Sequence, residues 1–299
     1  MNILITGAKG QLGQDCVSVL RGKHSVSAVD IDELDIAAAE AVDAGVQALN
    51  PQVIVNCAAY TLVDACEHHD ETAWQVNADG PANLARAAAR TGARLIHIST
   101  DYVFDGEKPV PEAYTESDTT NPLSVYGRTK LAGEERIMAA CDNYVILRTA
   151  WLYGANGKNF ISTILRKVLN EPQVRLKIVN DQYGSPTWSY RLAMQIDGLL
   201  PTSARGIYHA SSEGYCTWHE LAVKLLAELD LSGRITACTT ADYPTPAARP
   251  RNSILENRHL KSENLNVMRH WQTDLQAFLK THGQALTTAL QQTTSGVFS

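Results

Sequence analysis

The fold of this chain is most clearly predicted by the residues Ile3-Leu4-Ile5-Thr6-Gly7-Ala8-Lys9-Gly10-Gln11-Leu12-Gly13. An apolar run with strand character leads into glycines at Gly7, Gly10 and Gly13, and the last of these opens a segment with helical periodicity. A glycine turn between a strand and a helix lets backbone N–H groups approach a pyrophosphate. The spacing predicts a dinucleotide site in the first strand-turn-helix unit, although a tight turn without a ligand has the same spacing.

The pattern of this first unit continues over the next 140 residues or so. Runs with strand character recur at Ile3 to Thr6, Val26 to Val29, Val53 to Asn56, Leu95 to Ser99 and Tyr144 to Arg148. Alanine-rich segments with helical periodicity alternate with them, at Gly13 to Leu20, Ala37 to Leu49, Ala73 to Thr91 and Ser124 to Ala140. Short buried strands alternating with helices imply a parallel sheet covered on both faces. We predict an α/β fold with a Rossmann-type doubly wound parallel sheet, formed by residues 1–153 and by later segments that return to it.

After about Tyr153 the pattern becomes less regular, which indicates a second, smaller lobe. The expected elements are helices at Asn159 to Leu169, Thr217 to Leu229 and Thr273 to Thr281, a strand at Leu176 to Val179, a turn at Gly184 to Thr187, and a proline-rich stretch at Tyr243 to Pro250. We expect residues 154–299 to form mainly a C-terminal α/β substrate-binding lobe. The polar tail from about Gln291 should be frayed.

Composition excludes several classes of function. The chain of 299 residues has 44% hydrophobic and 19% charged residues, the balance of an ordinary globular protein. Its 26 basic and 32 acidic side chains give a net charge of −6, so nucleic acid and anionic membranes are not expected partners. The N-terminus lacks the features of a signal peptide, and no apolar run approaches the roughly 18 residues of a membrane span. These features predict a cytoplasmic protein.

Cysteine and histidine patterns give no sign of a metal centre. The six cysteines lack Cys-x-x-Cys spacing, so a zinc site or a disulfide framework is not expected. The segment Cys66-Glu67-His68-His69-Asp70 contains possible metal ligands, but adjacent histidines on an acidic loop are more typical of solvated surface. We therefore predict no metal-ligating residues from this pattern.

Asp30 stands at the end of the second strand, about 20 residues beyond the glycines. A carboxylate there can accept hydrogen bonds from the adenosine ribose, which favours NADH. It would repel a 2′-phosphate, but Lys9 and Arg21 could offset this effect, so NADPH stays open. Further along, Asp35 and Ile36 are expected beside the adenine, and the small residues of Asn56-Cys57-Ala58-Ala59-Tyr60 would let the dinucleotide cross the sheet edge.

Tyr126 and Lys130 are one helical turn apart, so one helix face can carry both. A tyrosine is a weak acid with a pKa near 10, and an ammonium beside it would lower that pKa. Tyr126 could then protonate the alkoxide that forms during a carbonyl reduction. Thr100, within Ser99-Thr100-Asp101 at the end of a strand, is placed to bond the carbonyl oxygen.

Several longer motifs narrow this interpretation. They lie at Gly7 to Gly13, Asn56 to Asp64, Ser99 to Gly106, Tyr126 to Glu134, Arg148 to Gly154, Asp181 to Thr187 and Ala248 to Ser253. Together they resemble the extended short-chain dehydrogenase/reductase superfamily and, more narrowly, the dTDP-4-dehydrorhamnose reductase family. The resemblance runs nearly end to end. It implies reduction of the 4-keto group of dTDP-4-dehydro-L-rhamnose by NADH or NADPH, giving dTDP-L-rhamnose, a donor for cell-surface polysaccharides.

The resemblance also implies roles for individual residues. Thr100, Tyr126 and Lys130 would be catalytic. The cofactor would meet Gly7, Gly10, Gln11, Leu12, Gly13, Asp30, Asp35, Ile36, Ala58, Ala59, Tyr60, Ile98, Tyr126 and Lys130. The substrate would meet Thr100, Asp101, Trp151, Arg249 and Asn252, with Arg249 pairing with the diphosphate or else exposed on a loop. The resemblance is compatible with a Mg²⁺ requirement and with a homodimer, and it implies neither.

Two other classes of protein share parts of this pattern. Nucleotide-sugar epimerases and 4,6-dehydratases have the glycine turn and the tyrosine-lysine pair, but in dehydratases an Asp-Glu pair follows the threonine. Here Tyr102 follows Asp101, so elimination lacks its second carboxylate. A relative of the family serves as a non-catalytic regulatory subunit of a methionine adenosyltransferase, yet Thr100, Tyr126 and Lys130 are all intact here.

Overall fold

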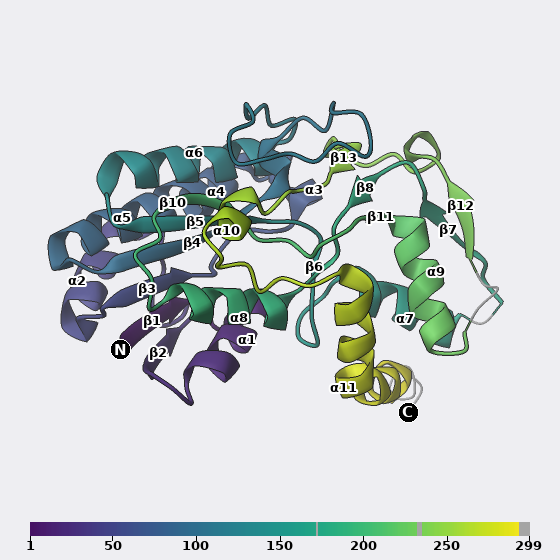
Figure 1. Ribbon diagram of the computed structural model, residues 1–299, viewed down its shortest axis with the longest axis horizontal. Coiled ribbons are helices and arrows are strands. Elements are labelled where there is room, and N and C mark those ends of the chain that lie inside the picture. The colour runs from purple at the N-terminus through teal and green to yellow at the C-terminus, as the bar shows by residue number, and fades with distance from the viewer. Residues whose placement is uncertain (172, 232–234, 293–299) are drawn as a thin grey trace.

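A computed structural model describes residues 1–171, 173–231 and 235–292 (Figure 1). Its main sheet has six strands in the order β10-β5-β4-β3-β1-β2, and every neighbouring pair is parallel. The predicted α/β class and the doubly wound sheet are therefore confirmed. The strand order reverses between β1 and β3, which opens a crevice at the carboxyl edge of the sheet. The six strands are β1 (Asn2–Thr6), β2 (Ser25–Val29), β3 (Val53–Asn56), β4 (Arg94–Thr100), β5 (Tyr144–Thr149) and β10 (Gly206–His209).

Both faces of the sheet are buried, because side chains alternate along each strand. In β1, Ile3 and Ile5 enter one apolar core, while Leu4 between them enters another on the opposite face. Each such side chain stabilises the fold by roughly 1.5–3 kcal/mol. The first core is closed by α1 (Gln11–Leu20) and α8 (Ser189–Leu199), and the second by α2 (Ala39–Leu49), α5 (Gly80–Thr91) and α6 (Val125–Ala140) (Figure 1).

A separate apolar core holds the second lobe together. Its helices are α7 (Phe160–Asn170), α9 (Trp218–Glu228) and α11 (Trp271–Gln292), which lie apart from the main sheet in Figure 1. Thr217 starts α9 with a capping box, in which its hydroxyl accepts from the Glu220 amide and the Glu220 carboxylate accepts from the Thr217 amide. The strands here are short: β7 (Leu176–Val179) pairs with β12 (Ile235–Cys238), β6 (Leu152–Tyr153) with β9 (Thr187–Trp188), and β8 (Tyr183–Gly184) with β11 (Cys216–Thr217) and β13 (Asn252–Ser253).

Two later segments return to the first lobe: α8 packs on α1, and β10 extends the sheet beside β5. The remaining short helices are α3 (Val63–Cys66), α4 (Asp70–Trp74) and α10 (Arg258–Ser262). Over the three described ranges, no helix combines the length and apolar character needed to cross a bilayer.

The helix expected at Ala73 to Thr91 is interrupted. Between α4 and α5 the chain forms a π-helical turn, Gln75–Asp79, which points Asn77 inward. The buried Asn77 amide accepts from the backbone N–H of Tyr60 (2.8 Å) and donates to its carbonyl (3.0 Å). Helical periodicity alone did not predict this turn, because the partner loop is distant in sequence.

The last helix is also longer than expected, because α11 packs on α7 along much of its length and continues to Gln292. The expected frayed tail begins within it, at Gln291, and its remainder, from residue 293, lies outside the described residues.

Candidate active site

The glycine turn brings the loops after β1 and β3 into contact. Gly7 has φ +66°, and a Cβ atom on it would lie 2.6 Å from the amide nitrogen of Ala58. A Cβ on Gly13 would lie 2.1 Å from the Gly7 carbonyl oxygen. Gly10 caps α1 without any side-chain hydrogen bond, so the first N–H groups of the helix are left for another acceptor. This bare, positively polarised helix end fits a pyrophosphate.

Three residues expected at the cofactor have their side chains engaged elsewhere. Leu12 is buried in one apolar core of the sheet, and Ile36 is buried in the other, where its side chain packs against Gly80. The side-chain oxygen Oε1 of Gln11 accepts from Nδ2 of Asn159 at 2.8 Å. A cofactor contact by the Leu12 or Ile36 side chain therefore finds no support in this geometry.

Asp30 is held against the glycine turn, since its Oδ2 accepts from the backbone N–H of Lys9 at 2.7 Å. The exposed Lys9 ammonium pairs with Asp32 (2.9 Å) and Glu33 (3.3 Å). Arg21 is the C-terminal cap of α1, and the length of that helix, about 15 Å, separates it from the turn. The idea that Arg21 offsets repulsion of a 2′-phosphate is therefore wrong. Around Asp30, one basic side chain, Lys9, therefore stands against two further acidic side chains, Asp32 and Glu33.

The other residues expected around the cofactor lie at the same edge of the sheet. Ala58, Ala59 and Tyr60 follow β3 directly and are partly buried, and Asn77 fixes the main chain of Tyr60. Asp35 is exposed, and its carboxylate accepts from the backbone N–H of Ala37 at 2.9 Å.

The helix that carries Tyr126 docks tightly on the end of β4. Ser124 caps α6 by accepting from the Gly127 amide at 3.1 Å. A Cβ on Gly127 would lie 2.3 Å from the Tyr102 carbonyl oxygen, so only glycine allows this approach. The rings of Tyr102 and Tyr126 then meet edge to face, 5.5 Å apart. The structure thus brings Tyr126 beside the strand end that carries Thr100.

The electrostatics of the tyrosine-lysine pair differ from the expectation. Lys130 is buried, donates to the Ile98 carbonyl at 2.6 Å, and has a pKa that burial lowers to about 8. Burial also raises the pKa of Tyr126, with the Thr100 hydroxyl opposing the shift and Asp101 adding to it. The phenol is therefore not acidified in the protein alone, because desolvation outweighs any effect of the lysine.

Thr100 and Asp101 form a buried polar pair at the end of β4. The threonine hydroxyl donates to Asp101 Oδ1 at 3.0 Å, and Asp101 Oδ2 has no partner among the described residues. Burial raises the pKa of Asp101 to about 6, although the nearby Ser253 and Thr100 hydroxyls oppose the shift. An unpaired buried carboxyl oxygen costs stability unless a ligand satisfies it.

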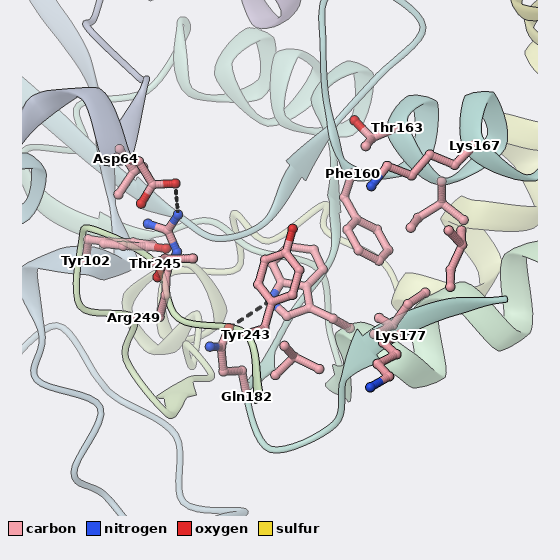
Figure 2. Close-up of a pocket in the computed structure, with 16 residues that line it drawn as sticks. Asp64, Tyr102, Phe160, Thr163, Lys167, Lys177, Gln182, Tyr243, Thr245 and Arg249 are labelled. Carbon is pink, nitrogen blue, oxygen red and sulfur yellow. Dashed lines mark hydrogen bonds and ion pairs between the residues drawn. The ribbon is translucent and has the colours of Figure 1, made fainter. Parts of the chain in front are cut away.

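A cavity of about 390 Å³ lies next to this pair, between the two lobes. Figure 2 shows Arg249 beside Asp64 at one side, and Lys167 and Lys177 from the second lobe at the other. Three cations against one carboxylate favour an anionic ligand in a chain whose net charge is −6. The lining comprises Val63, Asp64, Tyr102, Phe160, Thr163, Ile164, Lys167, Leu176, Lys177, Ile178, Val179, Gln182, Trp218, Tyr243, Thr245 and Arg249.

Of the five residues expected at the substrate, Arg249 lines this cavity, whereas Thr100, Asp101, Trp151 and Asn252 are not among its lining residues. Arg249 pairs with Asp64 at 2.8 Å, and its Nη1 is buried without a partner among the described residues. The Asn252 amide instead donates to the carbonyls of Lys108 (3.1 Å) and Glu112 (2.8 Å). Its side chain holds a neighbouring loop, so its predicted substrate contact finds no support in this geometry.

Trp151 contacts the cavity wall through Trp218, which lines the cavity. Its backbone has φ +48°, which is uncommon for a residue other than glycine. Its ring stacks on that of Trp218 and covers Gly184, where a Cβ would lie 2.4 Å from the indole. Strain of this kind is found where the surrounding structure fixes a functional side chain.

The segment considered as a metal site does not gather ligands. His68, His69 and Asp70 are exposed, and in the part of the chain that the structure describes no three His, Cys, Asp or Glu side chains are grouped to hold an ion.

The parallel sheet, the glycine turn and the Tyr126–Lys130 helix beside Thr100 define a short-chain dehydrogenase/reductase. Residues 1–283 match the family model described as "RmlD substrate binding domain". The chain belongs to the dTDP-4-dehydrorhamnose reductase family, a family of oxidoreductases.

Individual relatives agree with this assignment. A dTDP-4-dehydrorhamnose reductase of Streptomyces griseus is 40% identical over 280 residues, which cover 91% of each chain. A crystal structure of such a reductase from Clostridium acetobutylicum superposes with a TM-score of 0.90 at 41% identity, covering 94% of this chain and 99% of that one. The Bacillus anthracis reductase in complex with NADP gives a TM-score of 0.90 at 37% identity with the same coverage.

Several residues that line the cavity were not predicted from the sequence, namely Phe160, Lys167, Lys177, Trp218 and Tyr243. They come from α7, β7, α9 and the proline-rich stretch, which are far apart along the chain. Only two aromatic residues stood at positions that could have drawn notice in the sequence. Trp218 follows a threonine that caps a helix, and Tyr243 begins the proline-rich stretch. Neither pattern shows which side chains meet.

Proposed function

We propose that this protein reduces the C4 ketone of dTDP-4-dehydro-L-rhamnose to give dTDP-L-rhamnose. The observation that carries the proposal is the contact between Tyr126 and Tyr102, because it joins the catalytic helix to a cationic cavity sized for a nucleotide sugar. The family of the chain supports the same reaction.

The glycine turn would hold the cofactor. Backbone N–H groups at Gly10 and Gly13 face the pyrophosphate, and Asp30 faces the adenosine ribose. Bound NADH or NADPH would supply the hydride. The acidic surroundings of Asp30, with Asp32 and Glu33 against Lys9, favour NADH over NADPH because they repel a 2′-phosphate.

Tyr126 donates the proton to the C4 oxygen as negative charge develops there. The raised pKa keeps the phenol protonated before the reaction, which suits a proton donor. The Thr100 hydroxyl bonds the same oxygen, and Lys130 orients the cofactor ribose and stabilises the phenolate left on Tyr126. Because one donor suffices, the absence of a glutamate after Asp101 is no obstacle to reduction.

The substrate would lie across the boundary of the lobes. The unpaired Asp101 oxygen accepts from a sugar hydroxyl, and the sugar rests against Trp151. Arg249 Nη1 donates to the diphosphate, while Lys167 and Lys177 add positive charge on the far side of the cavity. In this assignment residues 1–153 mainly bind the cofactor and residues 154–299 mainly bind the substrate. No residues are assigned to Mg²⁺.

The decisive experiment incubates purified protein with dTDP-4-dehydro-L-rhamnose and either NADH or NADPH. We expect one reduced cofactor consumed per dTDP-L-rhamnose formed, faster with NADH, and a lower rate with the UDP-linked sugar. Tyr126→Phe, with the same fold by circular dichroism, is the matched control and should be nearly inactive. Product formation without net cofactor consumption would indicate an epimerase instead, and a folded protein with no turnover would overturn the proposal.

A further inference from the structure

Two free cysteines from distant parts of the chain meet beside the glycine turn. Cys16 lies in the second turn of α1 and has no exposed surface, whereas Cys57 directly follows β3 and is partly exposed. Their thiols form a hydrogen bond, with the two sulfur atoms 3.9 Å apart. A disulfide needs about 2.05 Å between its sulfurs, so a further approach of ~1.9 Å would join them.

The main chain near both cysteines is packed against the turn. A Cβ on Gly7 would lie 2.8 Å from the carbonyl carbon of Cys57, and the Cys57 N–H donates to the Thr6 carbonyl at 3.1 Å. Cys16 follows Gly13 by about one helical turn, and a Cβ on Gly13 would lie 2.1 Å from the Gly7 carbonyl oxygen. Because these backbones are already in close contact, drawing the two sulfurs together would displace the glycine turn.

Cys57 is the thiol that an oxidant reaches first, since it is the partly exposed member of the pair. Burial lowers the pKa of Lys130 to about 8, and the charges of Glu134 and then Cys57 oppose this shift, so the thiol lies within electrostatic reach of the ammonium. A cation near a thiol favours the reactive thiolate. The hydrogen bond with Cys57, and then burial, raise the pKa of Cys16, so Cys16 keeps its proton.

We propose that Cys16 and Cys57 form an oxidation site: hydrogen peroxide joins the two thiols in a disulfide, and the disulfide displaces the dinucleotide from the glycine turn. The Cys57 thiolate attacks one peroxide oxygen and the O–O bond breaks. Hydroxide leaves, takes up the proton that the thiol released, and Cys57 becomes a sulfenic acid. The Cys16 sulfur then attacks the Cys57 sulfur, the S–O bond breaks, and hydroxide leaves as water with the Cys16 proton. Both sulfurs are oxidised, and one peroxide is reduced to two waters.

Intact-mass spectrometry tests the covalent step without substrate or cofactor. The reduced protein, treated with hydrogen peroxide and then with catalase, should lose two hydrogen atoms, about 2 Da. Tandem mass spectrometry of the linked peptides should assign the bond to Cys16 and Cys57. Cys238→Ser removes the other partly exposed cysteine and should keep this bond. Cys16→Ala should instead gain one oxygen atom, about 16 Da, at Cys57.

Fluorescence titration tests the consequence for the cofactor. The Kd of NADH or NADPH, whichever the reduced protein binds more tightly, should rise about 10-fold or more on oxidation and return to the reduced value with dithiothreitol. No bond, a bond to another cysteine, or a linked protein with unchanged cofactor affinity would overturn the proposal. If Cys16→Ala does not fold, the two measurements on the parent protein decide. A reduced protein that binds the cofactor without reducing the sugar would refute only the reaction proposed above.

Discussion

The indole rings of Trp151 and Trp218 are stacked, with centroids 3.5 Å apart and planes inclined by 8°. Trp151 comes from the end of the sheet domain and Trp218 from the first turn of α9, so the stack joins the two lobes beside the cavity. Such pairs contribute about 0.5–1.5 kcal/mol beyond the area that they bury.

Trp218→Ala should weaken substrate binding, because Trp151 loses the ring that holds its indole in place. We expect KM for the dTDP-sugar to rise about 10-fold, equivalent to about 1.4 kcal/mol, with the Kd of NADH unchanged. Trp218→Phe keeps an aromatic ring that can stack on Trp151, so its KM for the dTDP-sugar should be close to that of the parent protein. Steady-state kinetics and fluorescence titration of the cofactor measure the two effects. An equal loss of NADH affinity would show that the stack supports the whole site instead.

Tyr126→Phe should lower kcat by roughly 10²- to 10⁴-fold, because a positioned acid is lost. NADH binding should remain largely intact. Tyr208→Phe is a matched control, since the Tyr208 hydroxyl bonds Glu263 (3.0 Å) away from the site and its loss should not affect turnover. Unchanged turnover in Tyr126→Phe would exclude this residue as the proton donor.

Asp30→Ser should shift cofactor preference toward NADPH, because a negative charge near the adenosine ribose is removed. We expect the ratio of kcat/KM for NADH to that for NADPH to fall by about 10-fold or more, about 1.4 kcal/mol. Asp43→Asn removes an exposed carboxylate that pairs with Arg90 and should leave the ratio as it was. If both variants behave alike, local charge at Asp30 does not set the preference.

Arg249→Gln should raise KM for the dTDP-sugar by roughly 10- to 100-fold, because a charged hydrogen bond contributes about 1.5–3 kcal/mol. The affinity for NADH should not change. Asp64→Asn keeps the arginine charge while removing its carboxylate partner, so substrate binding should be equal or tighter. A calorimetric titration with dTDP alone separates a direct diphosphate contact from an indirect effect. If Arg249→Gln binds dTDP as tightly as the parent protein does, Arg249 does not contact the diphosphate.

Acid should destabilise the fold partly through His209. Burial, and then the charge of Arg148, lower the pKa of His209 to about 3, whereas an unfolded histidine titrates near 6.5. Below pH 6.5 the unfolded chain therefore binds a proton that the folded one does not, and this stability is lost as the pH falls toward 3. The loss reaches about 2 kcal/mol at pH 5. Urea unfolding at pH 7.5 and pH 5 gives the free energy of unfolding of the parent protein and of His209→Gln. The difference between the two proteins should shrink by about 2 kcal/mol from pH 7.5 to pH 5. The same difference at both pH values would contradict this prediction.

Much of the architecture was predictable because it depends on local patterns. The continuous apolar run Ile3-Leu4-Ile5 predicted a strand buried on both faces of the sheet, and the glycines at Gly7 and Gly13 predicted the turn after it. The π-helical turn at Asn77 and the full length of α11 were not predictable, since each depends on a partner from another part of the chain.

Local patterns in the chain were enough to establish the parallel sheet, the glycine turn and the spacing of Tyr126 and Lys130, because steric limits and side-chain periodicity act over a few residues. What these groups contact depends on long-range packing. It stacked Trp218 on Trp151, set Arg249 against Asp64 from 185 residues away, and buried Lys130 against Ile98 and His97. Spacing predicted an ammonium that acidifies a phenol, but desolvation, which exists only in the packed interior, lowers the pKa of Lys130 and raises that of Tyr126.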